Sequence, residues 1–448
     1  MDYVATVLTT SVLWMPYFNI GLGLSPAWLA AILMILRAWD AVSDPLMGNI
    51  SDNARTRWGR RRPFIVVGAF CTAAVYPFLW RPPTGHGDWA MAVYLTVVGI
   101  LFFTSFTCWS MPYYALQLEL TPNYDERTRL TAWMTFVGKL TSLAGGWLLA
   151  FLASPLFANK TTGKADIVGA MQTCSWYIAG IILVLGLMPA FFVKDRPLAA
   201  MASHQATESF WASIRESAHC KPFWTLIAVT FFLIMGNTAM GSLGTYVNVY
   251  LVNDGDLGAA SIIEGWRSSG ALITGLASIP FWTWVAERFD KKVALQLVLG
   301  IGVLAHLLYI VCIRPDMPYL QVVPGVLQSG VLGAVWLILP SMKADAAEYE
   351  ELRTGRRREG SLNAFYSWFV KVALTLGVGL NGVLFTLSGF DVKLAAQPAE
   401  VLMRMKAVFI ICPILLWVCA LLVLRSFVLT RGRMRSIRDE LEIRRGVA

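Results

Sequence analysis

Three ionisable side chains stand inside an apolar stretch near the start of the chain. Arg37, Asp40 and Asp44 occur within the run LRAWDAVSDPLMGNI, where most neighbours are hydrophobic. A spacing of three to four residues places all three on one face of a helix. Two carboxylates one turn apart, with the Ser43 hydroxyl beside them, offer hard oxygen ligands to a small cation or a place to hold a proton.

The alternative to a cation site is a static ion pair between Arg37 and Asp40 that only helps to hold helices together. Such a pair needs one acid, and Asp44 then remains in the apolar stretch without a base of its own on the same helix. An ionised side chain that faces lipid costs at least about 2.5–3.5 kcal/mol, so these groups are expected to face inward. The sequence therefore favours a functional site over a static pair.

The composition of the whole chain is that of a membrane protein. Of its 448 residues 56% are hydrophobic and 15% charged, and the mean hydropathy is +0.58. A soluble domain this apolar would aggregate, so we predict an all-α polytopic membrane protein. About twelve apolar runs have the length of roughly 20 residues that spans a bilayer. They are 3–24, 27–50, 63–81, 88–118, 130–153, 171–194, 222–252, 262–286, 292–314, 317–343, 361–389 and 402–428.

A single long polar interval divides these runs into two sets of six. The predicted organisation is an N-terminal six-helix bundle over 1–194, a cytoplasmic linker over 195–221, a C-terminal six-helix bundle over 222–428 and a basic cytoplasmic tail over 429–448. Arginine and lysine clusters follow the second, eighth, tenth and twelfth runs, which lie on one side of the membrane if helices alternate. The positive-inside rule then makes both termini cytoplasmic, so the net charge of +9 reflects topology rather than nucleic-acid binding.

Other kinds of chemistry find little support in the sequence. The seven cysteines are scattered without CxxC spacing, which predicts free thiols. Neither a nucleophile with its base nor a P-loop is present, so we expect no enzyme activity and no cofactor beyond a coupling ion, Na⁺ or H⁺.

The motif R-x-W-D-A-x-x-D-P-x-x-G, followed by RTRWGRRRPF, is specific enough to suggest a family. It resembles the glycoside-pentoside-hexuronide:cation symporters of the major facilitator superfamily, typified by melibiose permease. The later segments WLILPSMKADAAEYEELRTGRRREG and WFVKVALTLG resemble the same family, and GRRRPFI is similar to the sucrose:proton symporters. The resemblance implies twelve transmembrane helices in two six-helix bundles.

The resemblance also implies roles for individual residues. The cation-coupling set and its associated charges are Asp40, Asp44, Ser43 and Thr107, with Arg37 and Lys371. The candidate solute-binding set is Ser110, Tyr114, Trp336, Gln117, Asn19 and Lys139. Ser110 falls where melibiose permease has a sugar-binding carboxylate, and Tyr114 falls where it has a stacking tryptophan. The sugar-binding carboxylate on the first helix of that permease falls near Val4 of this chain. Asp2 is close by but out of register. The resemblance thus supports coupling to a cation better than it supports binding of a galactoside.

Charged residues at the predicted cytoplasmic helix ends form a second constellation. One interpretation is a gate whose ion pairs join the two bundles in the outward-open state and separate when the transporter opens inward. The other is a solvated helix with local ion pairs. The candidate gate residues are Asp52, Arg60, Arg61, Asp345, Glu348 and Arg357.

The function predicted from the sequence is secondary active transport, with Na⁺-coupled or H⁺-coupled symport of a sugar or glycoside by alternating access. An acidic sugar or an amphiphilic solute is the alternative, with Lys139 and Lys371 available to an anion. A non-transporting sensor or a membrane enzyme is a remote third possibility. We expect a monomer in a bacterial inner membrane, with a small solute and the lipid bilayer as its partners and no nucleic acid.

Overall fold

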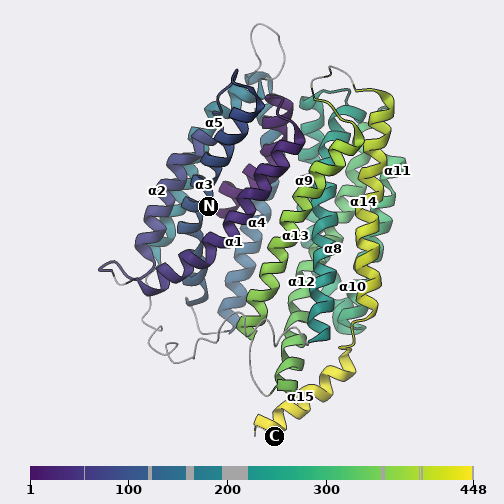
Figure 1. Ribbon diagram of the computed structural model, residues 1–448. Helices are drawn as coiled ribbons and strands as arrows, with labels where there is room; N and C mark the ends of the chain where they lie inside the picture. The colour runs from purple at the N-terminus through teal and green to yellow at the C-terminus, as the bar shows by residue number, and fades with distance from the viewer. Residues whose placement is uncertain are drawn as a thin grey trace. The chain divides into compact units, whose positions relative to one another are not determined.

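The computed structural model describes residues 1–54, 56–119, 124–157, 166–193, 220–354, 359–392, 394 and 397–445. Within these ranges every regular element is a helix (Figure 1). Ten of the described helices are long and apolar enough to cross a membrane, and two shorter apolar helices accompany them. The predicted all-α membrane architecture is therefore confirmed.

The chain divides into two compact units. The first comprises Met1–Gln205, Gly255–Gly265 and Gly382–Val401, and the second comprises Ala206–Asp254, Trp266–Asn381 and Leu402–Ala448. Each unit thus takes most of its residues from one half of the chain.

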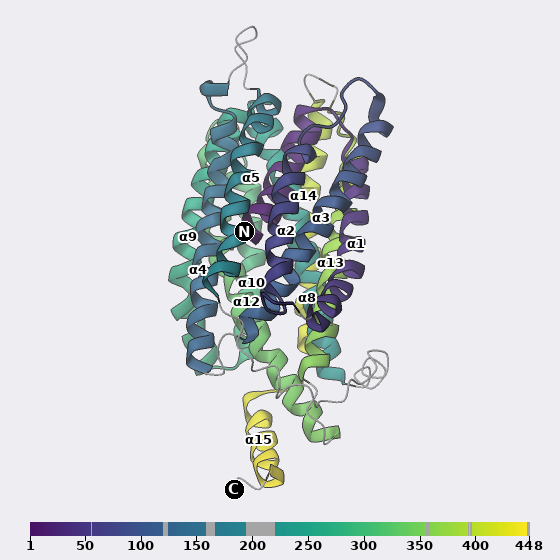
Figure 2. The ribbon, with the colours of Figure 1, turned by 90° about the vertical axis from the view of Figure 1, so that its left-hand side faces the viewer.

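Helices α1, α2, α3 and α5 pack together in the first unit. Its elements are η1 (Tyr3–Leu13), η2 (Pro16–Gly21), α1 (Pro26–Asn53), α2 (Arg62–Leu79), α3 (Gly87–Glu119), α4 (Tyr124–Leu152), η3 (Pro155–Phe157) and α5 (Ile167–Phe192). Helix α2 lies between α3 and α5, and α1 packs on α3 (Figure 2). Fully buried aromatic rings, among them Tyr76, Trp80 and Phe102, fill the space between these helices.

The first apolar run is helical over residues 2–21, in agreement with the span expected over 3–24, but most of it is π-helix. It forms two π-helical segments, η1 and η2, and the second begins at Pro16. Proline lacks an N–H and clashes with the preceding turn, which explains a change of helix at this point. The run ends at Gly23, whose positive φ of 78° suits glycine. The buried Asn19 amide braces this turn by donating to the Leu24 carbonyl at 2.7 Å.

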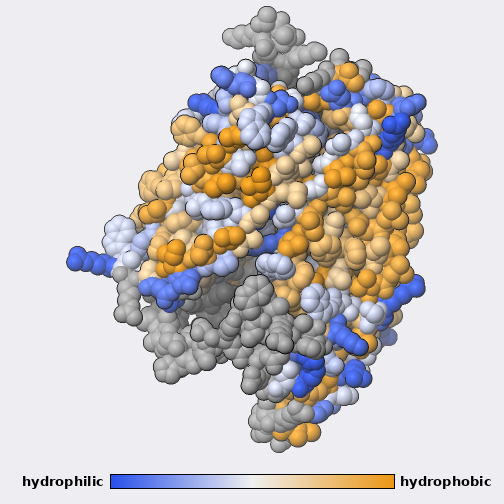
Figure 3. All heavy atoms as spheres, in the orientation of Figure 1, coloured by the Kyte–Doolittle hydropathy of each residue, from blue (hydrophilic) through white to orange (hydrophobic). Residues whose placement is uncertain are grey.

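The second unit has its core among α8, α10, α12 and α14. It holds α8 (Lys221–Tyr246), η4 (Val247–Val252), α10 (Lys291–Leu307), α11 (Tyr309–Cys312), η5 (Pro318–Gln321), α12 (Val322–Thr354) and α15 (Arg431–Arg445). It also holds most of α9 (Leu257–Arg288), α13 (Glu359–Ser388) and α14 (Ala399–Arg425), whose remaining ends belong to the first unit. Apolar residues such as Ile411, Leu415 and Leu422 are more than half exposed along α14. The surface over α14 is mainly hydrophobic between hydrophilic ends, as expected for a lipid-facing helix (Figure 3).

Helix α15 gives structure to the basic tail that was predicted only by its charge. Met434, Ile437 and Leu441 recur at helical spacing and are buried in the core of the second unit. Asp290 fixes where the helix begins. One oxygen of its carboxylate accepts from the backbone N–H of Lys292 at 2.9 Å and the other from that of Arg431 at 2.8 Å. One side chain therefore caps the start of both α10 and α15.

Gly68 is the residue on which the contact between α2 and α3 depends most. A Cβ at this position would lie 2.5 Å from the backbone nitrogen of Trp109 and 2.8 Å from its Cα. We expect Gly68→Ala to force the helices apart at a cost of about 1–3 kcal/mol, which lowers the melting temperature by several degrees. The control is Gly180→Ala in α5, where the added Cβ meets nothing within 4 Å. Equal melting temperatures for the two variants would contradict this packing.

Candidate functional site

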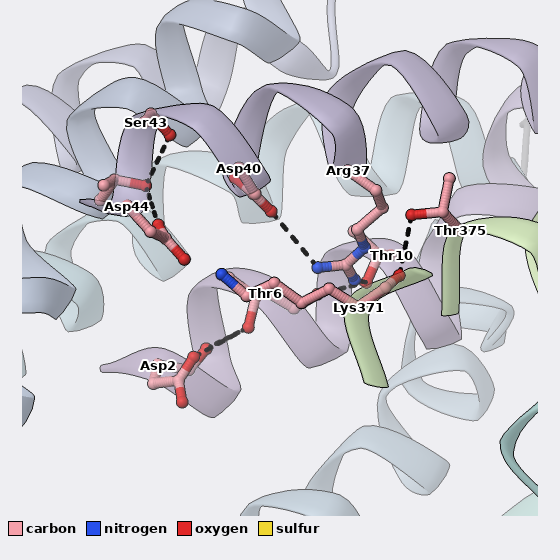
Figure 4. A network of polar contacts seen from close by, with 10 residues as sticks. Asp2, Thr6, Thr10, Arg37, Asp40, Ser43, Asp44, Lys371 and Thr375 are labelled. Carbon is pink, nitrogen blue, oxygen red and sulfur yellow. Dashed lines mark hydrogen bonds and ion pairs between the residues drawn. The ribbon is translucent and has the colours of Figure 1, made fainter. Parts of the chain in front are cut away.

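Helix α1 presents its charged residues on one face, as predicted. The Arg37 guanidinium and the Asp40 carboxylate form an ion pair of 3.5 Å (Figure 4). Their side chains are 30% and 14% exposed, so the pair is only partly solvated. Arg37 also donates to the Thr10 hydroxyl of η1 at 3.5 Å, and its guanidinium lies 5.8 Å from the centre of the Phe103 ring. A carboxylate, a hydroxyl and an aromatic ring thus surround this arginine.

Asp44 has a different environment one turn further along α1. The Thr107 hydroxyl of α3 donates to its carboxylate at 3.0 Å, and the Ser43 and Thr107 hydroxyls lie 3.4 Å apart. Both hydroxyl side chains are buried. The structure therefore brings together three of the four predicted cation ligands, while Asp40 pairs with Arg37 on the neighbouring turn (Figure 4). Carboxylate and hydroxyl oxygens suit a hard cation or a proton.

Asp2 belongs to the same polar region, although the sequence did not single it out as a candidate. Its carboxylate accepts hydrogen bonds from Tyr114 of α3 and, at 3.0 Å, from Thr6 of η1. The signal was present in the sequence, because Asp2, Thr6 and Thr10 are spaced four residues apart and share a helix face. The family's first-helix carboxylate aligns with Val4 rather than with Asp2, so the resemblance did not point to Asp2.

Ser110 continues the polar stripe of α3 between Thr107 and Tyr114. Its side chain is 1% exposed, and its hydroxyl has no hydrogen-bond partner among the described residues. A buried hydroxyl without a partner costs about 1–3 kcal/mol.

The other predicted site residues stand on several elements of both units, and their roles stay predictions. Asn19 braces the turn before α1. Lys139 is half-buried on α4 and has no ion pair among the described residues. Trp336 is 57% exposed on α12 and Lys371 is half-buried on α13, both in the second unit. The side chain of Gln117 lies outside the described part of the structure.

The two acids predicted for the gate on α12 find their partners within their own unit. Asp345 is 4% exposed and pairs with Lys291 of α10 at 2.6 Å and with Arg438 of α15 at 3.1 Å. Arg438 also pairs with Glu348 at 2.7 Å. This hydrogen bond to Glu348 is the main cause that raises the pKa of the Arg438 guanidinium. Ion pairs between the bundles stay a prediction for these residues.

The other gate candidates are less fully described. Arg60 and Arg61 immediately precede α2, and Arg61 is only 5% exposed. Arg357 and the side chain of Asp52 lie outside the described residues.

The spanning helices and the ionisable cluster on α1 define a membrane transporter of the major facilitator type. The chain belongs to the family of MFS/sugar transport proteins, whose model matches residues 2–431. This match confirms the predicted fold class and the resemblance to the symporter family. The protein is therefore an integral membrane transporter of small solutes and not an enzyme.

Curated relatives of this chain carry the names of symporters and carriers. It is 26% identical over 422 residues to the putative glycoside/cation symporter YagG of Escherichia coli, covering 94% of this chain and 87% of the relative. It is 24% identical to the glucuronide carrier protein homolog of Escherichia coli, covering 96% and 91%. It is also 24% identical to the sodium-dependent lysophosphatidylcholine symporter 1 of Xenopus tropicalis, covering 93% and 83%.

Solved structures share the fold at much lower identity. The nucleoside transporter NupG superposes with a TM-score of 0.63 at 12% identity, covering 95% of this chain and 98% of that one.

Proposed function

We propose that the protein is a secondary transporter that couples the movement of a sugar or glycoside to that of Na⁺ or H⁺. The observation that carries the proposal is the Asp44 carboxylate with the buried hydroxyls of Ser43 and Thr107, one turn from the pair of Arg37 and Asp40. Ionisable groups at membrane depth are costly and are kept chiefly where they serve ion or solute movement. The printed name of YagG, a glycoside/cation symporter, supports the same function.

Coupling follows from the charge on Asp44. When Na⁺ binds, the hydroxyl of Thr107 turns a lone pair toward the ion in place of its hydrogen bond to the carboxylate. When a proton binds instead, Asp44 becomes neutral and gains an O–H donor while its carbonyl oxygen can still accept from Thr107. Either cation neutralises this carboxylate, while Arg37 keeps Asp40 compensated. The change of access between the two sides of the membrane then costs less with the cation bound than without it.

A neutral polyhydroxylated solute suits the polar groups beside this cluster. The Asp2 carboxylate accepts hydroxyl hydrogen bonds, Tyr114 offers a ring face and Ser110 has an unused hydroxyl. Asp2 offers a neutral sugar a carboxylate from a different helix and position than Ser110, and its charge disfavours a hexuronate.

An acidic or amphiphilic solute is the second candidate. The half-buried Lys139, which has no ion pair among the described residues, favours an anion. The names of a glucuronide carrier homolog and a lysophosphatidylcholine symporter among the relatives point the same way.

The orientation in the membrane follows from the basic residues. The positive-inside rule favours a cytoplasmic location for the end that carries α15 and for both chain termini. A bacterial inner membrane is the proposed location.

Equilibrium binding of melibiose, a neutral glucoside and a glucuronide separates the two solute classes. At fixed Na⁺ and pH we expect the glucoside to bind best, and Asp2→Asn to weaken it by about tenfold to a hundredfold through loss of charge-assisted hydrogen bonds. Melibiose is expected to bind poorly because Ser110 supplies no carboxylate. The control is Asp88→Asn, which removes an exposed acid at the start of α3. A preference for the glucuronide that disappears in Lys139→Gln would overturn the neutral-sugar assignment in favour of the anion.

A further inference from the structure

A cavity of about 440 Å³ lies within the second unit, where α15 meets the ends of α9, α10 and α12. This volume is within the range of roughly 300–1,000 Å³ that is typical of small-molecule sites. Charged groups from four helices line it together with an apolar wall. The lining residues that matter here are Glu287, Leu337, Ile338, Leu429, Met434 and Arg435.

Most other charged groups around this cavity already have partners. Asp345 is bound by Lys291 and Arg438. Asp290 accepts the backbone N–H of Arg431, and the Arg431 guanidinium donates to the backbone carbonyl of Glu287. These interactions hold α15 in place. The ion pairs compensate the charge of Asp345, whereas Asp290 and Arg431 keep their charges but are engaged by backbone groups.

Arg435 and Glu287 are different. Neither the guanidinium nor the carboxylate has a hydrogen bond or an ion pair among the described residues, and both side chains are exposed at the cavity. One site thus offers an available cation from α15 and an available anion from α9. A ligand that carries a single charge would leave one of the two without a counterpart.

Aromatic side chains place this cavity at the depth of lipid headgroups. Phe281 and Trp284 on α9, and Phe289 in the turn directly after it, are each more than half exposed and follow one another along the chain beside the cavity residues Thr283 and Glu287. Exposed aromatic rings collect at the boundary between hydrocarbon and water. The apolar wall, which includes the 39% exposed Leu337, continues from this level.

We propose that the cavity binds a phosphoethanolamine headgroup, supplied by a membrane lipid of the leaflet on the α15 side. The Arg435 guanidinium binds the phosphate, for which its planar fork of donors is well suited. The Glu287 carboxylate accepts from the ammonium, and an acyl chain lies along Leu337. Because the two ligands come from α15 and α9, the bound lipid holds α15 against the unit. This site is distinct from the transport site and does not depend on which solute is carried.

Native mass spectrometry of the purified full-length chain, combined with thermal melting, tests the proposal. Phosphatidylethanolamine and phosphatidylglycerol with identical acyl chains are titrated into lipid-free protein in detergent. We expect the wild type to retain the ethanolamine lipid about tenfold more tightly, and to melt at a higher temperature with it. Arg435→Gln should weaken the binding of both lipids. Glu287→Gln should lower the affinity for phosphatidylethanolamine to that for phosphatidylglycerol.

The control is Arg433→Gln, which removes the same charge from the same helix but does not line the cavity. If Arg433→Gln weakens lipid binding as much as Arg435→Gln, lipid binding depends only on the net positive charge of α15 and the proposed site is wrong. It is also wrong if Glu287→Gln leaves the preference for ethanolamine unchanged. Free phosphoethanolamine and inorganic phosphate form the soluble arms. If free phosphoethanolamine raised the melting temperature as much as the lipid does, a membrane lipid would not be the source of the bound headgroup.

Discussion

Asp44→Asn is expected to abolish uphill accumulation of the solute while leaving exchange of solute across the membrane intact. The asparagine keeps the volume and can still accept from Thr107, but it has no charge for a cation to neutralise. A tenfold cation gradient, about 1.4 kcal/mol, sustains up to about tenfold accumulation at one-to-one coupling. The variant should therefore reach a ratio of about one.

Proteoliposomes loaded with solute measure both activities of this variant. Counterflow of labelled solute should stay within a few-fold of the wild type, which shows that the protein is folded and able to change access. Asp88→Asn, which removes an exposed acid, should accumulate normally. Accumulation by Asp44→Asn at the wild-type ratio would remove this carboxylate from the coupling mechanism.

The ion pair of Arg37 and Asp40 should behave as a unit in which loss of one partner is worse than loss of both. Removing one member leaves the other charge partly buried, which costs up to about 3–5 kcal/mol in a fully buried pair. Because these side chains are 30% and 14% exposed, we expect about 2 kcal/mol, or a melting temperature roughly 2–4 °C lower, for either single variant.

The comparison uses Asp40→Asn, Arg37→Gln and the double variant in the same detergent. The double variant should melt closer to the wild type than either single one, because it buries no uncompensated charge. Additive losses in the double variant would mean that Arg37 and Asp40 stabilise the protein separately, and Asp40 would return to the candidates for cation ligands.

The sequence predicted the spans and the charged face of α1 because both depend on local spacing. Runs of about 20 apolar residues allow hardly any structure but a helix in lipid, and an interval of four residues fixes which side chains share a face. The grouping of Asp44 with Thr107 came from the resemblance, since the two residues lie on different helices. Asp40 pairs with Arg37, whereas Asp44 contacts hydroxyl groups. This difference depends on how the helices pack, so the sequence could not predict it.

Other features escaped the sequence for identifiable reasons. The π-helical geometry of the first run has no signal in its apolar composition. The helix α15 was treated as a basic tail, although Met434, Ile437 and Leu441 already have helical spacing. The pairing of Arg438 with Asp345 and Glu348 required knowing where that helix docks. Asp2 was passed over because its register differs from that of the family it resembles.

Cation movement driven by solute in purified proteoliposomes tests the central claim most directly. With equal cation concentrations on both sides and no membrane potential, addition of solute outside should carry Na⁺ or H⁺ inward at a fixed ratio to solute, and Asp44→Asn should carry none. Solute uptake by the wild type without any accompanying cation, in Na⁺ buffers and across the pH range alike, would contradict coupled transport.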